Sequence, residues 1–252
     1  MNADRALERL TADPSRTGVF CDFDGTLSVV VDHPDAAEPA PGAVRVMERL
    51  AAAFRVVGVI SGRSLEDLRA RFDPEGAVLA GAYGREKSDR PLAVATRDWG
   101  PVADATTTGV HGWDGVLVEQ KDSGVAIHYR LAPARGDDVV ALAGALAARF
   151  GLEVRRGRMV AELTEPGPGK GEALSSLVDE YRLSAFLFAG DDLADAEAFR
   201  WARSSSHSCV LVGVRSDEAP AAIERDADIV VDAPTGLVRL LDLLAERVRR
   251  PD

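Results

Sequence analysis

The sequence has 252 residues, of which 46% are hydrophobic, and its formal net charge is −11. This length and composition fit one large globular domain or two small ones, and the acidic charge argues against nucleic acid or an anionic membrane as a partner. A phosphorylated substrate remains compatible, because a bound metal ion and a few local cations can reverse the field inside one pocket.

The two cysteines, Cys21 and Cys209, lie in apolar runs and predict buried free thiols rather than a disulfide framework. The first 16 residues contain no apolar segment of the signal-peptide type. No run approaches the roughly 18 apolar residues that a membrane span needs. We therefore expect a reduced, cytoplasmic monomer that binds neither membranes nor nucleic acid.

Strands and helices are expected to alternate along the first hundred residues. The expected elements are a helix over 4–10, a strand ending at Asp22, a loop over 28–40, a helix over 42–54, a strand over 55–60, a helix over 65–72 and a strand over 77–80. This alternation predicts a parallel sheet with right-handed crossovers.

The pattern changes over residues 100–165. Two short hairpins are expected on either side of one helix, with strands over 116–119, 125–130, 152–156 and 158–163 and a helix over 137–150. A Pro-Gly-Pro-Gly hinge at 166–169 follows. This segment is predicted to be an antiparallel insert.

The first pattern resumes after the hinge. Helices are expected over 170–181, 192–202, 218–225 and 237–248, and strands over 184–190, 209–214 and 229–231. The predicted fold is α/β, with a Rossmann-like parallel sheet and helices on both faces formed by residues 1–99 and 166–252. The inserted α+β domain spans 100–165.

Two carboxylates end the first predicted strand. Asp22 and Asp24 are two residues apart, so in an extended chain they point to the same side. Open α/β sheets bind ligands at this carboxyl end of their strands. Two neighbouring anions repel and require a cation, a shared proton or a substrate that uses the repulsion. The alternative is an ordinary Asp-Gly-Thr turn after an edge strand.

Three further signals fall at strand ends or at a helix start. Ser61 follows the second strand, Lys170 opens the helix after the hinge, and Asp191 and Asp192 follow a later strand. Asp195 is four residues after Asp191, a spacing at which the two can share a helix face. Each signal alone has an ordinary explanation, such as a turn, a solvated lysine or an acidic helix start, but their combination and order indicate one site.

Together these motifs resemble the four motifs of the haloacid dehalogenase-like phosphatases, and residues 100–165 sit where that superfamily places a cap domain. The resemblance implies that Asp22 is the nucleophile and that Asp24 is the general acid and base. It further implies that the phosphoryl group is bound by Thr26, Ser61, Gly62 and Lys170. The implied Mg²⁺ ligands are Asp22, Asp191 and the carbonyl of Asp24. Asp192 is implied to orient the site rather than to bind the metal directly, and Asp195 is able to take either of these two roles.

The chemistry of these residue types agrees with that implication. A carboxylate cannot approach a phosphate dianion unless positive charge offsets the repulsion, and Mg²⁺ together with Lys170 supplies it. The ligands are hard oxygen atoms, and no Cys/His cluster lies nearby in the sequence, which favours Mg²⁺ over zinc.

A narrower resemblance concerns the trehalose-6-phosphate phosphatases. It rests on Asp24-Gly-Thr-Leu, His33-Pro34-Asp35-x-Ala37, Val59-Ile60-Ser61-Gly62-Arg63, Glu119-x-Lys121, His128-Tyr129-Arg130, the stretch from Gly157-Arg158 to Glu162, and Gly169-Lys170-Gly171. The resemblance implies hydrolysis of trehalose 6-phosphate to trehalose and phosphate through an aspartyl-phosphate. The sugar is assigned to Arg63, Tyr83, Glu119, Lys121, Arg130 and Glu162.

Some positions depart from that family, which usually has His at Tyr83, Thr and Glu at Ala194 and Ala196, and Pro at Val29. A related sugar phosphate or a trehalose-like pseudo-disaccharide phosphate is therefore an alternative substrate, and a catalytically inactive sugar-phosphate sensor is a further alternative. Cross-strand ion pairs on a solvated sheet face are the alternative role for Glu119, Lys121 and Arg130. His128 is expected to be structural.

Overall fold

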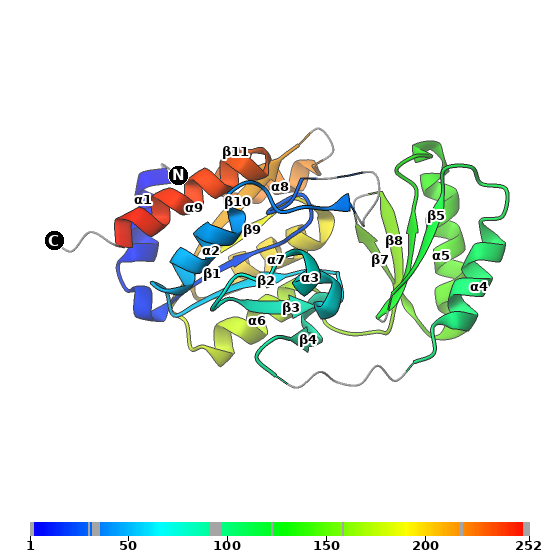
Figure 1. The fold of residues 1–252 in the computed structure, drawn as a ribbon, viewed down its shortest axis with the longest axis horizontal. Helices are drawn as coiled ribbons and strands as arrows, with labels where there is room; N and C mark the ends of the chain where they lie inside the picture. The colour runs from blue at the N-terminus through cyan, green and yellow to red at the C-terminus, as the bar shows by residue number, and fades with distance from the viewer. Residues whose placement is uncertain are drawn as a thin grey trace. The chain divides into compact units, whose positions relative to one another are not determined.

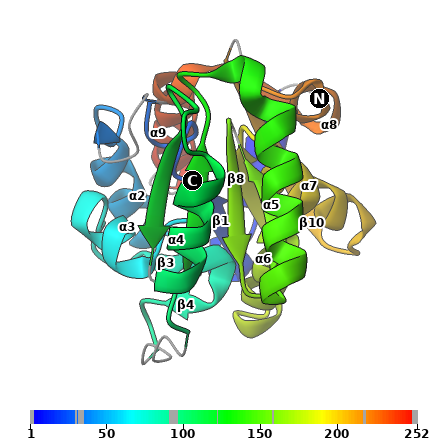
Figure 2. The same ribbon diagram turned by 90° about the vertical axis from the view of Figure 1, so that its right-hand side faces the viewer.

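The structure is a computed structural model that describes residues 3–29, 31, 36–90, 97–121, 123–157, 159–216 and 219–248. The chain divides into two compact units, one formed by Met1–Leu92 with Pro168–Asp252 and the other by Ala93–Gly167. Figures 1 and 2 show the ribbon from two directions. His33, Pro34, Asp35 and Arg158, which contribute to the resemblance above, lie outside the described residues.

The first unit is built on a seven-stranded sheet with the order β11-β10-β9-β1-β2-β3-β4. Its strands are β1 (Thr17–Cys21), β2 (Val56–Ile60), β3 (Val78–Gly81), β4 (Glu86–Lys87), β9 (Ala185–Gly190), β10 (Ser208–Arg215) and β11 (Ile229–Asp232). All neighbours pair in parallel except β3 and β4. The predicted parallel sheet is confirmed, whereas β4 was not predicted, because two residues show no periodicity.

Helices cover both faces of this sheet, as predicted (Figure 1). They are α1 (Ala3–Thr11), α2 (Ala43–Ala51), α3 (Leu65–Arg71), α6 (Lys170–Glu180), α7 (Leu193–Ser204), α8 (Ala221–Asp226) and α9 (Ala233–Val248). Val19 and Cys21 pack on the side of α2 and α9, while Phe20 packs on the side of α6 and α7. Successive side chains of a strand point to opposite faces, so the uninterrupted apolar run of β1 marks a strand buried on both.

Several helix ends differ from the predicted bounds, and α2 and α9 differ by three and four residues. Helix α2 ends at Ala51, and the N–H groups of Ala53 and Phe54 both donate to the carbonyl of Leu50 in the turn that follows. Helix α9 begins at Ala233, with Pro234 in the first turn, where a missing N–H costs nothing. No helix in the described ranges has the length and apolar character to cross a bilayer.

The chain order reverses beside β1. Strands β2 and β3 follow on one side, and β9, β10 and β11 lie on the other. Ligands of open α/β sheets bind at such a reversal, outside the carboxyl ends of the strands. The residues that follow β9, β1 and β2 therefore share one edge of the sheet.

The second unit contains an antiparallel sheet with the order β5-β6-β8-β7. Its elements are α4 (Gly100–Gly109), β5 (Leu117–Lys121), β6 (Gly124–His128), α5 (Gly136–Phe150), β7 (Glu153–Gly157) and β8 (Val160–Thr164). Both predicted hairpins are present. Helix α4 was missed because its sequence, rich in glycine and threonine, has no clear apolar period.

The two faces of this second sheet differ in polarity. Val125, Ile127, Ala161 and Leu163 pack in a core with residues of α4 and α5, which lie against the sheet in Figure 2. Because side chains alternate along a strand, the intervening residues point to the other face. That face, which we call the polar sheet face, carries Glu119, Lys121, His128, Glu153, Arg155 and Glu162.

Candidate active site

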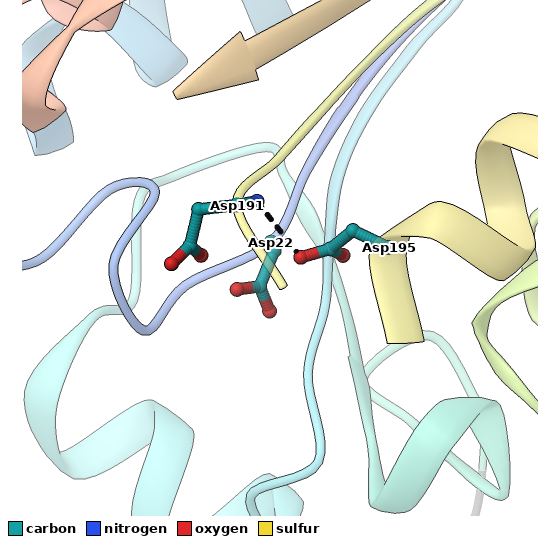
Figure 3. A group of neighbouring side chains, drawn as sticks. All are labelled: Asp22, Asp191 and Asp195. Atoms are coloured by element: carbon teal, nitrogen blue, oxygen red, sulfur yellow. Dashed lines mark hydrogen bonds between the residues drawn. The ribbon is translucent and has the colours of Figure 1, made fainter. Parts of the chain in front are cut away.

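Three buried carboxylates gather at the carboxyl edge of the parallel sheet (Figure 3). Asp22 follows β1, Asp191 follows β9, and Asp195 lies in the first turn of α7. One carboxylate oxygen of each lies within 4.8 Å of the others. Strand β1 is flanked by β9 and β2, so the interpretation of Asp22 and Asp24 as part of a turn after an edge strand is wrong.

The turn between β9 and α7 is held by reciprocal hydrogen bonds. Asp192 caps the helix by accepting from the N–H of Asp195 at 2.9 Å, and Asp195 Oδ2 accepts from the N–H groups of Asp191 and Asp192, both at 3.0 Å. This is a capping box. Asp191 and Asp195 do not share a helix face, because α7 begins at Leu193 and Asp191 precedes it.

The ammonium group of Lys170 lies among these carboxylates. Lys170 Nζ is 2.8 Å from Asp22 Oδ1, 2.8 Å from Asp195 Oδ1 and 3.7 Å from Asp192 Oδ1. The Lys170 side chain is only 3% exposed. Burial alone would lower the pKa of Lys170, but the three carboxylates reverse that effect and raise the pKa well above its ordinary value. Lys170 therefore stays charged.

The carboxylates respond to the same environment in different directions. Burial raises the pKa of Asp22 to about 8, against the opposing charge of Lys170. Burial, followed by the charge of Asp192, also raises the pKa of Asp195 well above its ordinary value. Burial opposes ionisation of Asp192 as well, but the charge of Lys170 and hydrogen bonds from Asp195 lower its pKa. In the metal-free chain burial therefore favours the protonated form of Asp22, while Lys170 favours the ionised form.

The donor set suits a hard divalent cation. All three groups offer carboxylate oxygen, the ligand type that Mg²⁺ prefers. Both oxygens of Asp195 are already engaged, Oδ1 by Lys170 and Oδ2 by two backbone N–H groups. Asp22 and Asp191 are therefore better suited than Asp195 to hold a cation, which would compete with the proton on Asp22.

The loop after β1 wraps the Asp191 carboxylate. The Thr26 hydroxyl, assigned above to phosphate, is buried and donates to Asp191 Oδ1 at 3.0 Å. Gly25 has a φ of +84°, and a Cβ there would lie 2.2 Å from Asp191 Oδ2. Only glycine allows this close approach and this backbone conformation without strain.

The remaining residues assigned to phosphate lie at the end of β2. Ser61 is buried, and its Oγ accepts from the N–H of Arg63 at 3.2 Å. The Tyr83 ring lies directly over Gly62, where a Cβ would be 2.8 Å from its Cζ and hydroxyl oxygen. Tyr83 itself has a φ of 57°, a left-handed conformation that costs an L-residue about 1–2 kcal/mol. Surrounding contacts must therefore hold this tyrosine in place.

Asp24 and Arg63 meet in a bidentate ion pair. Asp24 Oδ2 accepts from Arg63 Nε and Oδ1 accepts from Arg63 Nη2, both at 2.7 Å. Arg63 Nη1 donates to Asp67 at 2.5 Å. The resemblance assigns Arg63 to the sugar, but here its guanidinium binds two carboxylates of its own chain. The spacing of four residues between Arg63 and Asp67 could have predicted their ion pair, whereas nothing in the sequence indicates that Arg63 pairs with Asp24.

Residues assigned to the sugar lie together on the polar sheet face of the second unit. Lys121 Nζ is 2.5 Å from Glu162 Oε1 and 3.8 Å from Glu119 Oε2. The imidazole of His128 adds a contact that the sequence did not indicate, 2.7 Å from Glu119 Oε2. Arg130 lies two residues beyond the end of β6. Cross-strand ion pairs are thus present, but the face is not fully solvated, since the Glu162 side chain is only 9% exposed.

Solved structures share this fold. The C-terminal domain of trehalose-6-phosphate phosphatase from C. albicans superposes with a TM-score of 0.79 at 21% identity, covering 98% of this chain and 97% of that one. A haloacid dehalogenase-like hydrolase from Bacteroides thetaiotaomicron gives a TM-score of 0.62 at 14% identity, covering 90% and 99%. The fold is that of the haloacid dehalogenase-like hydrolases.

Sequence comparison shows which family within this class of hydrolases the chain belongs to. Residues 20–228 match the model of the trehalose-phosphatase family, and the chain belongs to that family. The trehalose-phosphate phosphatase of Mycobacterium avium is 34% identical over 251 residues, covering 92% of this chain and 63% of that protein. Its counterpart in Mycobacterium marinum is 37% identical over 199 residues, covering 73% and 51%. This chain thus spans less than two thirds of the length of these relatives.

Proposed function

We propose that this chain is a Mg²⁺-dependent phosphoric monoester hydrolase that converts trehalose 6-phosphate to trehalose and phosphate. The observation that carries the proposal is the position of Lys170 Nζ, 2.8 Å from both Asp22 and Asp195 at the carboxyl edge of the sheet. A buried ammonium beside a buried carboxylate creates a place where an anionic ester can meet a nucleophile. Membership of the trehalose-phosphatase family supports the choice of substrate.

In the proposed reaction, the Asp22 carboxylate attacks phosphorus and forms an aspartyl-phosphate. The bond from phosphorus to the sugar oxygen breaks, and that oxygen takes its electron pair and a proton from Asp24. Asp24 then accepts a proton from a water molecule that attacks the aspartyl-phosphate, which releases phosphate and restores Asp22. Lys170, Ser61 and Gly62 are assigned to the phosphoryl oxygens, whereas the Thr26 hydroxyl donates to Asp191 and holds that carboxylate.

The proposed metal ligands are the side chains of Asp22 and Asp191 and the carbonyl of Asp24. Bound Mg²⁺ would offset charge on the phosphoryl group. Asp192 and Asp195 hold the turn that carries Asp191, through the capping box described above. We assign them to positioning this turn.

We further propose that residues 100–165 form a cap domain that determines substrate specificity, while 1–99 and 166–252 form the phosphatase core. The sugar hydroxyls are assigned to Glu119, Lys121, Arg130 and Glu162. Carboxylates accept hydrogen bonds from hydroxyl groups, and lysine and arginine donate to their oxygens. The close pair of Lys121 and Glu162 offers both kinds of group at one place.

One observation favours a second candidate. Tyr83 packs over Gly62, next to Ser61 of the proposed phosphate loop, and it occupies a position where the family usually has histidine. A larger phenol there changes the space available to the sugar. The second candidate is therefore a phosphatase of a related sugar phosphate or of a trehalose-like pseudo-disaccharide phosphate.

Phosphate release from a substrate panel tests both candidates. The panel contains trehalose 6-phosphate, glucose 6-phosphate and mannosyl phosphates, each measured with Mg²⁺ and with EDTA. We expect Mg²⁺-dependent release with the highest kcat/KM on trehalose 6-phosphate. A higher value on another member would favour the second candidate, and no release above buffer from any member would leave the sensor alternative.

Replacing Glu162 with alanine should separate sugar binding from chemistry. Hydrolysis of p-nitrophenyl phosphate should stay within about two-fold of wild type, while kcat/KM for the sugar phosphate should fall about ten-fold or more, since a hydrogen bond to a charged group contributes about 1.5–3 kcal/mol. The matched control is Glu153→Ala, on the same face of the neighbouring strand β7, which should alter neither rate. Equal losses on both substrates would contradict the sugar role.

A further inference from the structure

Within the described residues, the carboxylate assigned to proton transfer accepts hydrogen bonds from the side chain of Arg63. Asp24 lies in the loop after β1 and its side chain is 45% exposed, so little packing restrains its rotamer. Both of its oxygens nevertheless accept from Arg63, at 2.7 Å each. Two parallel hydrogen bonds from a planar guanidinium fix the position of a carboxylate and also the plane in which it lies.

Arg63 is itself immobilised from several directions. Its side chain is 8% exposed, its Nη1 donates to Asp67, and its guanidinium lies 5.7 Å from the centre of the Phe23 ring. Its backbone is also held, since its N–H donates to Ser61 Oγ and its carbonyl accepts from the N–H of Ala82 at 2.7 Å. The side chain and the backbone of Arg63 are therefore both held in place between β2 and α3.

Asp67, on helix α3, also holds Arg63 in place. Its N–H donates to Ser64 Oγ, the N-cap of that helix, and its Oδ1 accepts from Arg71 Nε at 2.9 Å. Its Oδ2 accepts from Arg63. Charge-assisted hydrogen bonds thus run from Asp67, in the first turn of α3, through Arg63 to Asp24.

We propose that Arg63 is a positioning residue for Asp24, holding its carboxylate in the orientation required to exchange a proton with the leaving oxygen. This inference rests on the proposed function of the site. Lysine cannot replace Arg63 in this role, because an ammonium group is a point charge and lacks the planar pair of N–H donors of a guanidinium. The guanidinium donates to both Asp24 and Asp67, which supports a role in holding carboxylates of its own chain.

A leaving-group comparison tests the proposal without any sugar. Phenyl phosphate has a poor leaving group that needs a proton, whereas the leaving group of p-nitrophenyl phosphate departs with little assistance. General acid catalysis contributes about 10²–10⁴-fold. We expect Arg63→Lys to lower kcat/KM for phenyl phosphate about 10–100-fold and for p-nitrophenyl phosphate less than about three-fold, with the loss in kcat rather than in KM.

The matched control is Arg71→Lys, which alters the other arginine bound to Asp67 but makes no described contact with Asp24. It should leave both substrates unchanged. Equal losses of Arg63→Lys on the two aryl phosphates would indicate general damage and overturn the proposal. A loss confined to trehalose 6-phosphate would overturn it in favour of sugar contact.

The wild-type rates separate this inference from the proposed function. Release of phosphate by the wild-type protein tests the phosphatase assignment, whereas the ratio between aryl phosphates in Arg63→Lys tests the positioning role. A wild-type protein without activity on any phosphoester would overturn both. An active wild type whose Arg63→Lys variant keeps the same ratio would overturn the positioning role alone.

Discussion

Replacing Asp22 with asparagine is expected to abolish phosphate release while leaving the fold intact. The amide has the same shape as the carboxylate but lacks the anionic oxygen that attacks phosphorus, so kcat should fall by at least about 10⁴-fold. Phosphate release under multiple turnover measures this, with mass spectrometry to show that the amide has not hydrolysed. Retained turnover in the verified variant would contradict the assignment of Asp22 as nucleophile.

The same variant has an expected stability signature. The pKa of Asp22 is about 8 in the folded chain and near 3.8 when unfolded, so between these values the folded state binds the additional proton. The free energy of unfolding of the metal-free wild type should therefore fall as pH rises through this window. An asparagine amide does not titrate, so the metal-free Asp22→Asn variant should melt no lower than wild type at pH 8, and its relative Tm should rise between pH 5 and 8.

A surface carboxylate provides the control. Asp242 on α9 forms an ion pair with Arg49 and is half exposed. Asp242→Asn makes the same chemical change at a surface site and should leave turnover unchanged. Loss of activity in this control would show that net charge, rather than the nucleophile, had been altered.

Replacing Lys170 with methionine should reduce both activity and stability. The ammonium contacts Asp22 and Asp195 at 2.8 Å in a site closed to solvent. Removing the ammonium leaves Asp22, Asp192 and Asp195 without the positive charge that offsets their mutual repulsion, so we also expect Tm to fall. We expect kcat/KM for trehalose 6-phosphate to fall at least about 10³-fold, since one such donor at a developing charge is worth about 10²–10³ and Asp22 also loses the cation that favours its ionised form.

A second buried lysine separates the two effects. Lys87 on β4 is 8% exposed and its Nζ lies 2.8 Å from Glu180 Oε2, outside the carboxylate cluster. Lys87→Met should lower Tm by a similar mechanism yet keep kcat/KM within about two-fold at temperatures well below Tm. Full activity of Lys170→Met under those conditions would contradict its assignment to the phosphoryl group.

The arrangement of strands was largely predictable because it follows from local patterns and general topology. The apolar runs before Asp22, Ser61 and Asp191 marked buried parallel strands. Once those strands lie side by side, their carboxyl ends must meet, which brings residues distant in sequence to one edge. The sequence could therefore indicate which residues meet without indicating how their side chains are arranged.

That arrangement depends on geometry that sequence spacing does not encode. The pairing of Arg63 with Asp24 joins two loops, and its donors could equally have faced a ligand. Asp191 and Asp195 could have shared a helix face because their spacing is four, but the helix starts only after Asp192. The N–H of Asp191 instead donates to the Asp195 carboxylate at the start of the helix. The spacing of four residues therefore reflects a capping interaction and not a shared helix face.

The two glycines that border the carboxylates limit how such a protein can be redesigned. A Cβ at Gly25 would lie 2.2 Å from the Asp191 carboxylate, and one at Gly190 would lie 2.3 Å from Asp195 Cγ. No other residue fits either position, so any variant library must leave both unchanged. Diversity is better introduced at Glu119, Lys121 and Glu162, which lie on paired strands away from these glycines. New substrates could then be selected without disturbing the groups that react.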